Sequence, residues 1–246
     1  MTDISFPDKK KVKQFIIQFA FRIPTRKELT GSEKKVLENT LREVNPQYFQ
    51  LLQEAAGPSP GTLFQFVHQI PVGPGTIMIP SFVLSNNSFS FIWPVRMGDQ
   101  WIPDFHSFDT RDMNRKISGW VVTVQNAITN SGCQRTGKIY EMVLGPFPEA
   151  DKANLFQALF SMSLGDVGEV SLAFTKYIKS DGSVHNIQTN INYMQQKLED
   201  TFYIRIRVDI NNRDLAPSMD PGPMAKVWNF ADDAIGSHLS GLLRME

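Results

Sequence analysis

Hydrophobic and polar residues alternate along parts of this chain in the way that predicts β-strands. The clearest case is the segment 200–210, where apolar residues occupy every second position and Tyr203, Arg205, Arg207 and Asp209 stand between them. Because side chains of a strand point alternately to the two faces of a sheet, this segment predicts an antiparallel sheet with one buried and one polar face. Further strands are predicted at 14–22, 62–70, 76–84, 88–95, 101–105, 138–144, 167–178 and 184–194.

Other segments have apolar residues at helical spacing. Thr30 and Glu33 form a capping-box pattern that opens a first helix, which the Asn45-Pro46 pair ends. A second helix is predicted by one apolar stripe from Met113 to Ile128, and a third spans 224–243. A short helix is expected at 155–160.

The order of these elements repeats. Both halves give β-α-β-β-β-α, which predicts an α+β fold of two similar halves, 1–131 and 132–246, with antiparallel sheets and helices packed on one face. The two halves share no motif, so the alternative is chance similarity within one large α+β domain. By element order alone, the repeat resembles the saddle of the TATA-binding protein and, distantly, helix-gripping ligand-binding folds.

Charge and cysteine content narrow the classes of function. The 25 basic residues balance 25 acidic ones, which argues against a nucleic-acid-binding protein and makes self-association, expected as a homodimer, easier. A single cysteine, Cys133, excludes an intramolecular disulfide and makes a thiolate metal site improbable. The polar N-terminus predicts no secretory signal, and no apolar run suits a membrane span, so a cytoplasmic location is expected.

No catalytic motif passes a test of its mechanics. The segment 57–61 matches G-x-S-x-G, but Pro60 follows Ser59 and has no N–H to offer to an oxyanion. Asp104 and His106 lack a third ligand for a metal. We therefore predict no catalytic residue, no metal and no cofactor, although an enzymatic activity stays open.

The polar face of 200–210 is the best candidate for binding. Tyr203, Arg205 and Arg207 project together, and His185 or Gln188 on the preceding strand would lie beside them, depending on the register. Tyrosine and arginine are common anchors of interfaces. The alternative is an ordinary solvated strand face.

Short segments resemble a sporadically distributed family of uncharacterised bacterial proteins of similar length. They are a Pro-preceded apolar strand near the start, Arg135-Thr136-Gly137 leading into a strand, the strand end Arg207-Val208-Asp209 and the closing amphipathic helix. Glu141 and Met142 depart from the pattern, which has Arg and Asn there. The family brings no activity, so it implies no site residues.

Three hypotheses of function follow. The first is a non-enzymatic binding or interaction module with an unknown ligand, acting as a homodimer. The second is a small-molecule binder or enzyme with a pocket between the curved sheet and a long helix, suggested by the Phe-rich interior. The third is nucleic-acid binding on a duplicated saddle, against which the neutral charge argues.

Overall fold

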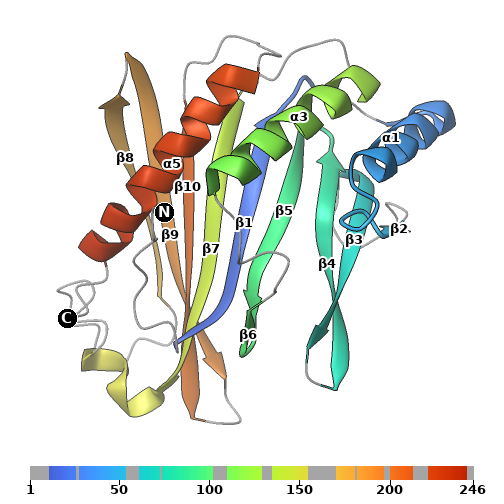
Figure 1. Cartoon of the computed structure of the whole chain (residues 1–246). Coiled ribbons are helices and arrows are strands. Elements are labelled where there is room, and N and C mark those ends of the chain that lie inside the picture. The colour runs from blue at the N-terminus through green and yellow to red at the C-terminus, as the bar shows by residue number, and fades with distance from the viewer. Residues whose placement is uncertain are drawn as a thin grey trace.

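The structure is a computed structural model that describes residues 11–25, 28–53, 61–72, 74–101, 110–128, 135–154, 170–180, 182–196, 200–212 and 221–242. These residues form one large sheet covered on one face by helices (Figure 1). The fold is therefore α+β with an antiparallel sheet, as the alternation in the sequence predicts. None of the helices in the described ranges combines the length and apolar character needed to cross a membrane.

The sheet has ten strands, and every pairing in it is antiparallel. Its order is β2-β3-β4-β5-β1-β7-β10-β9-β8, with the short β6 beside β5. The strands are β1 (Val12–Arg22), β2 (Leu51–Gln53), β3 (Thr62–Val72), β4 (Gly75–Ser85), β5 (Ser88–Met97), β6 (Gln100–Trp101), β7 (Arg135–Pro148), β8 (Ser171–Ser180), β9 (Ser183–Gln196) and β10 (Thr201–Asn212).

Three long helices lie on the same face of this sheet (Figure 1). They are α1 (Gly31–Val44), α3 (Thr110–Ile128) and α5 (Pro221–Leu242), and a short 3-10 helix, η1 (Glu149–Asp151), follows β7. The predicted capping box starts α1, because the Thr30 hydroxyl accepts from the Glu33 N–H while the Glu33 carboxylate accepts from the Thr30 N–H. Helix α3 lies between α1 and α5, and both α3 and α5 cross the middle of the sheet.

The centre of the sheet is where β1 pairs with β7. Strands from 1–131 and from 132–246 thereby belong to one continuous sheet. The division into these two parts is a prediction that nothing in this arrangement tests. The β1–β7 pairing makes the helix-covered face of the sheet continuous across the boundary, so the two parts share one hydrophobic core.

The alternation that predicted β10 is confirmed by burial. Its five apolar residues are fully buried under the helices, while Tyr203, Arg205, Arg207 and Asp209 are half-buried on the other face. Aromatic rings fill the core beside them: Phe21 stacks on Phe89 at 4.7 Å, and Trp228 of α5 meets Phe21 edge-on at 5.6 Å. The Phe residues noticed in the sequence therefore pack on one another in the interior of the fold.

One predicted strand end is wrong. The sequence places the end of the seventh strand at 144, before Gly145-Pro146, but β7 continues to Pro148. Gly145 has φ of +135°, a conformation open to glycine, and the register of β7 against β10 shifts beside it. The shift lets pairing resume beyond the proline. The predicted strand at 101–105 is described only as far as Trp101, and the predicted helix 155–160 lies outside the described residues.

A buried polar cluster joins the helices to the centre of the sheet. Lys138 of β7 and Asp232 of α5 form an ion pair at 2.6 Å, and their side chains are 0% and 4% exposed. Asn114 of α3 accepts from Lys138 at 3.0 Å and donates to Asp232 at 2.9 Å, and the Tyr140 hydroxyl donates to Asp232 at 2.7 Å. The lysine–aspartate pair is therefore also hydrogen-bonded to α3, through Asn114, and to β7, through Tyr140.

The surroundings of this cluster are apolar. The Lys138 ammonium lies 4.8 Å from the centre of the Phe19 ring. Burial lowers the pKa of Lys138 from its ordinary value, and the attraction of Asp232 offsets only part of that effect. Burial also raises the pKa of the Tyr140 hydroxyl well above its ordinary value, which keeps it a hydrogen-bond donor. Both directions show that the cluster is shielded from water.

Removing one partner of this pair is expected to destabilise the fold strongly. Asp232→Ala would leave the Lys138 ammonium buried without its counter-ion, and we expect a loss of about 3–5 kcal/mol in the free energy of unfolding, measured by urea denaturation. The double variant Lys138→Met with Asp232→Leu should lose much less, because no charge is then left buried.

The exposed pair of Lys116 and Asp112 on α3 supplies the control for this prediction. Asp112→Ala should cost about 0–1 kcal/mol, as is usual for surface ion pairs. A loss for Asp232→Ala no larger than the loss for Asp112→Ala would contradict a stabilising role for the buried pair.

Candidate functional site

The face of the sheet opposite the helices, which we call the open face, carries the predicted binding residues Tyr203, Arg205 and Arg207. Arg205 forms an ion pair at 2.8 Å with Glu141 of the neighbouring β7, and its side chain is 44% exposed. Arg207 lies directly opposite Glu141 on that same strand. Arg205 and Arg207 therefore share one carboxylate as their neighbour.

The other strand beside β10 presents a row of amides. Asn192 lies opposite Arg205, Asn190 opposite Arg207, and Gln188 opposite Asp209. Residues directly opposite each other in an antiparallel pair project to the same face, so this row belongs to the open face. The polar character of this face therefore extends over neighbouring strands.

The predicted convergence of His185 with these arginines does not occur. His185 lies opposite Asn212, at the far end of β10 from Arg205, and it points to the covered face. Its ring stacks on Phe230 of α5 with 4.0 Å between the centroids. The register could not be derived from the sequence, and its parity decides the face. Whether any of these four residues binds a ligand stays a prediction.

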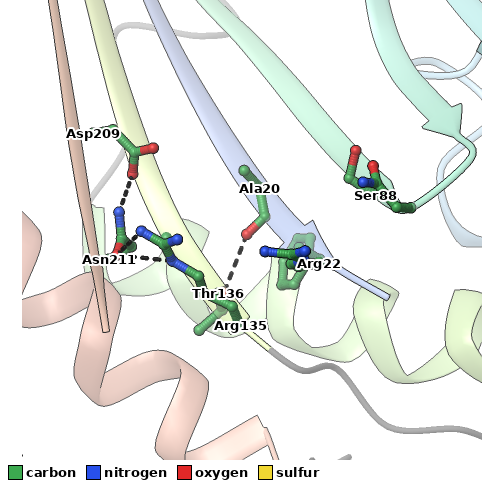
Figure 2. Close-up of a pocket in the computed structure, with 10 residues that line it drawn as sticks. Ala20, Arg22, Ser88, Arg135, Thr136, Asp209 and Asn211 are labelled. Carbon is green, nitrogen blue, oxygen red and sulfur yellow. Dashed lines mark hydrogen bonds between the residues drawn. The ribbon is translucent and has the colours of Figure 1, made fainter. Parts of the chain in front are cut away.

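A pocket of about 290 Å³ lies at one end of the open face, where β1 ends and β7 begins (Figure 2). We call it the paired-arginine pocket. Its side chains come from four neighbouring strands, so the sheet itself is its scaffold. The pocket is lined by Ala20, Phe21, Arg22, Asn87, Ser88, Arg135, Thr136, Gly137, Asp209 and Asn211.

Two arginines on neighbouring strands line this pocket. Arg22, the last residue of β1, lies directly opposite Arg135, the first residue of β7. On the other side of β1, Ser88 lies opposite Arg22 and adds a hydroxyl. Like charges directly opposite each other across strands destabilise a sheet.

Side chains of β10 hold Arg135 in place. Its guanidinium donates through Nε to Oδ1 of Asn211 at 2.9 Å and through a second nitrogen to the same oxygen. The Asn211 amide in turn donates to Asp209 at 2.8 Å, and Asn186 of β9 donates to Asn211 at 3.2 Å. Figure 2 shows Arg135, Asn211 and Asp209 along one wall of the pocket. Because Asn211 is neutral, its contact orients Arg135 without neutralising the charge.

Gly137 brings β10 close to this wall. A Cβ at this position would lie 2.7 Å from Cβ of Asn211, 3.0 Å from the Ile210 carbonyl oxygen and 3.1 Å from Oδ1 of Asp209. Such distances exclude any larger residue without a shift of the strand. The glycine therefore permits the close approach that holds the arginine, amide and carboxylate in one row.

Sequence reasoning missed Arg22, Arg135 and Asn211 as site residues. Part of the signal was present, because Arg135-Thr136-Gly137 and Asp209 are segments that carry the resemblance given above, and the structure brings them together in this pocket. Arg22 gave no signal, because an arginine at a strand end is commonplace. Its place opposite Arg135 depends on the pairing of β1 with β7 across more than a hundred residues.

A second cavity lies on the covered face, between α5 and the ends of β8, β9 and β10, and we call it the helix crevice. Its volume is about 570 Å³, within the range of small-molecule sites. The stacked rings of His185 and Phe230 line it, and Lys226 and Asp233 place opposite charges at its rim. The other lining residues are Ser180, Ser183, Asn212, Pro223, Val227 and Asn229.

Ser59, Asp104, His106 and Cys133 lie outside the described residues. Within the described ranges, no group of three or more His, Cys, Asp or Glu side chains is suited to hold a metal ion. The two cavities are therefore the candidate binding sites in the described part of the chain.

Comparison with known proteins gives no family for this chain: no family model, no curated protein and no solved structure matches it.

Gly137→Ala is expected to damage the paired-arginine pocket and the sheet beside it. The new methyl group would collide with Asn211 and the Ile210 carbonyl, so β10 has to move. Overpacking of this kind costs about 1–3 kcal/mol, which urea denaturation would measure. Gly119→Ala on α3, where nothing lies within 4 Å of the added atom, is the control and should be neutral or stabilising by up to about 1 kcal/mol. Equal stability of the two variants would contradict the close approach at Gly137.

Proposed function

We propose that this protein is a non-enzymatic binding module whose ligand carries a negatively charged group, held between Arg22 and Arg135. The observation that carries the proposal is the placement of these two arginines directly opposite each other in one pocket. Arginine binds carboxylate and phosphate groups through two parallel hydrogen bonds. Asn211 supports the proposal because it fixes the plane of the Arg135 guanidinium before a ligand arrives.

The lining of the pocket favours binding over chemistry. Among its ten residues there is no histidine or cysteine, the residues that most often act as general base or nucleophile in transfer reactions. Its one carboxylate, Asp209, accepts a hydrogen bond from Asn211. Two strands, β1 and β7, separate the strand of the Ser88 hydroxyl from the strand that carries this carboxylate. Recognition of an anion needs nothing more than the arginines, the amide and the hydroxyl.

We also propose that the chain arose by duplication of one β-α-β-β-β-α unit. The strand order supports this, because β3-β4-β5-β1 on one side of the centre corresponds to β8-β9-β10-β7 on the other. In both parts the long helix that follows, α3 or α5, lies on the same face. A homodimer is part of the proposal, and the neutral net charge supports it because association meets no overall repulsion.

The helix crevice supports a second candidate function, the binding of a small zwitterionic molecule. Lys226 and Asp233 stand seven residues apart on α5, which puts them on one side of the helix about 10 Å apart. Phe230 lies between them and stacks on His185. Opposite charges around an aromatic platform suit a ligand that has both an ammonium and a carboxylate group.

Anion binding is tested by isothermal titration calorimetry at low salt with inorganic phosphate, pyrophosphate and citrate. We expect one site per chain, and each of Arg22→Ala and Arg135→Ala should weaken binding about tenfold or more, since a hydrogen bond to a charged group contributes about 1.5–3 kcal/mol. Arg115→Ala, an exposed arginine on α3, is the matched control and should bind like the wild type.

The three probes distinguish a phosphate ligand from a carboxylate ligand. The absence of heat with all three at millimolar concentration would overturn the anion-binding proposal, as would unchanged affinity in both arginine variants. Retention of a single-stranded oligonucleotide that depends on the same arginines would instead make the nucleic-acid hypothesis the better one.

The crevice is tested by thermal and chemical denaturation in the presence of each of the common amino acids. A ligand at about one hundred times its dissociation constant should raise the free energy of unfolding by about 2.7 kcal/mol. Lys226→Ala and Asp233→Ala should each remove that rise, whereas Lys116→Ala on α3 should not. If no amino acid stabilises the wild type, this second candidate function falls and the anion site is unaffected.

A further inference from the structure

Strand β8 ends the sheet on one side, as Figure 1 shows at the left of the view. In the described part of the chain its strand partner is β9 alone. It is ten residues long, its pairing with β9 has no bulge, and each of its residues is exposed or half-buried. Phe174 and Tyr177 are 40% and 61% exposed. A long, regular edge strand with exposed rings is a template for pairing with another chain.

The hairpin geometry fixes which backbone groups of β8 point outward. Ser180 and Ser183 lie opposite each other and close a two-residue loop, so they exchange both backbone hydrogen bonds. Because such pairs alternate along an antiparallel ladder, Ile178, Lys176 and Phe174 bond toward β9. The odd-numbered positions, Thr175 and Ala173 among them, therefore direct their N–H and C=O groups to the outer edge.

We propose that a second copy of this chain pairs with the outer edge of β8, β8 against β8, about a two-fold axis at Thr175. This proposal deepens the homodimer of the proposed function and is independent of the anion site. The two ends of β8 are complementary under this symmetry, which favours a second copy of the chain as the partner. Thr175 would lie opposite Thr175 of the partner subunit, and both residues direct hydrogen-bonding groups outward.

Side-chain chemistry selects this register. With the axis at Thr175, Lys176 meets the partner's Phe174, an arrangement that allows a cation–π contact. On the same face Leu172 meets the partner's Ile178, and on the other face Tyr177 covers the partner's Ala173. If the axis passed through Lys176 instead, the two copies of Lys176 would lie directly opposite each other. Like charges in that position are destabilising. Lys176 and Lys179 thus discourage other pairings while permitting this one.

A two-fold axis perpendicular to the sheet keeps the helices of both protomers on one face. The two open faces would then form one surface, and the two paired-arginine pockets would lie on the same side of the dimer.

The first test compares Thr175→Pro with Thr175→Val by sedimentation velocity at micromolar concentration. The wild type and the valine variant should be dimers. The proline variant should be a monomer, because proline removes an outward N–H that pairing needs, while an edge strand tolerates it. A monomeric wild type would overturn both the homodimer and the edge pairing. A dimeric proline variant would leave the homodimer standing and overturn the edge pairing.

The second test does not depend on how well the proline variant folds. In a Cys133→Ser background, Thr175→Cys should form a disulfide-linked dimer on mild oxidation, since directly opposite residues have Cα atoms about 5.5 Å apart. Tyr177→Cys in the same background should not cross-link, because its copy would be about 14 Å away along the strands. Equal cross-linking of the two variants, or cross-linking of Tyr177→Cys alone, would overturn the register.

Discussion

The ion pair between Lys138 and Asp232 is the interaction on which the arrangement of the two layers depends. Apolar packing between helices and a sheet tolerates many side-chain substitutions, provided that the total volume is kept. A buried charge has no such freedom, since an ammonium moved away from its carboxylate would be left buried without its counter-ion. Asn114 extends the constraint to α3, so the two central helices and the central strand share one fixed point. We interpret the cluster as the element that sets the position of α5 over β7.

That fixed point also decides where the two cavities lie. Asn229 of the helix crevice accepts a hydrogen bond at 2.8 Å from Asn114, which belongs to the buried cluster. Gly137 and Thr136, which stand one and two residues before Lys138 on β7, line the paired-arginine pocket. Both cavities are thus built against the same rigid part of the molecule. Sites supported in this way hold their geometry better than sites on loops.

Local pattern was sufficient to predict most strands and helices, and contacts between distant segments were not predictable. The alternation in β10 and the capping box of α1 depend on neighbours in sequence, and both were found. Arg22 and Arg135 become neighbours only through the pairing of β1 with β7, which no local rule supplies. His185 was assigned to the wrong face because a register shift of one residue reverses every side chain of a strand. Lys138 opens a predicted strand, but no local pattern shows that its partner is Asp232, 94 residues further along the chain.

The pleat of β10 gives its last two residues different roles. Asn211 lines the paired-arginine pocket and Asn212 lines the helix crevice. Two consecutive residues of one strand therefore line the two cavities. The same holds on β9, where His185 faces the crevice and Asn186 bonds to Asn211. The end of the β9–β10 hairpin therefore separates the two cavities, and each of its faces lies toward one of them. Any coupling between ligands in the two cavities would act through this hairpin, and it would be reciprocal by necessity.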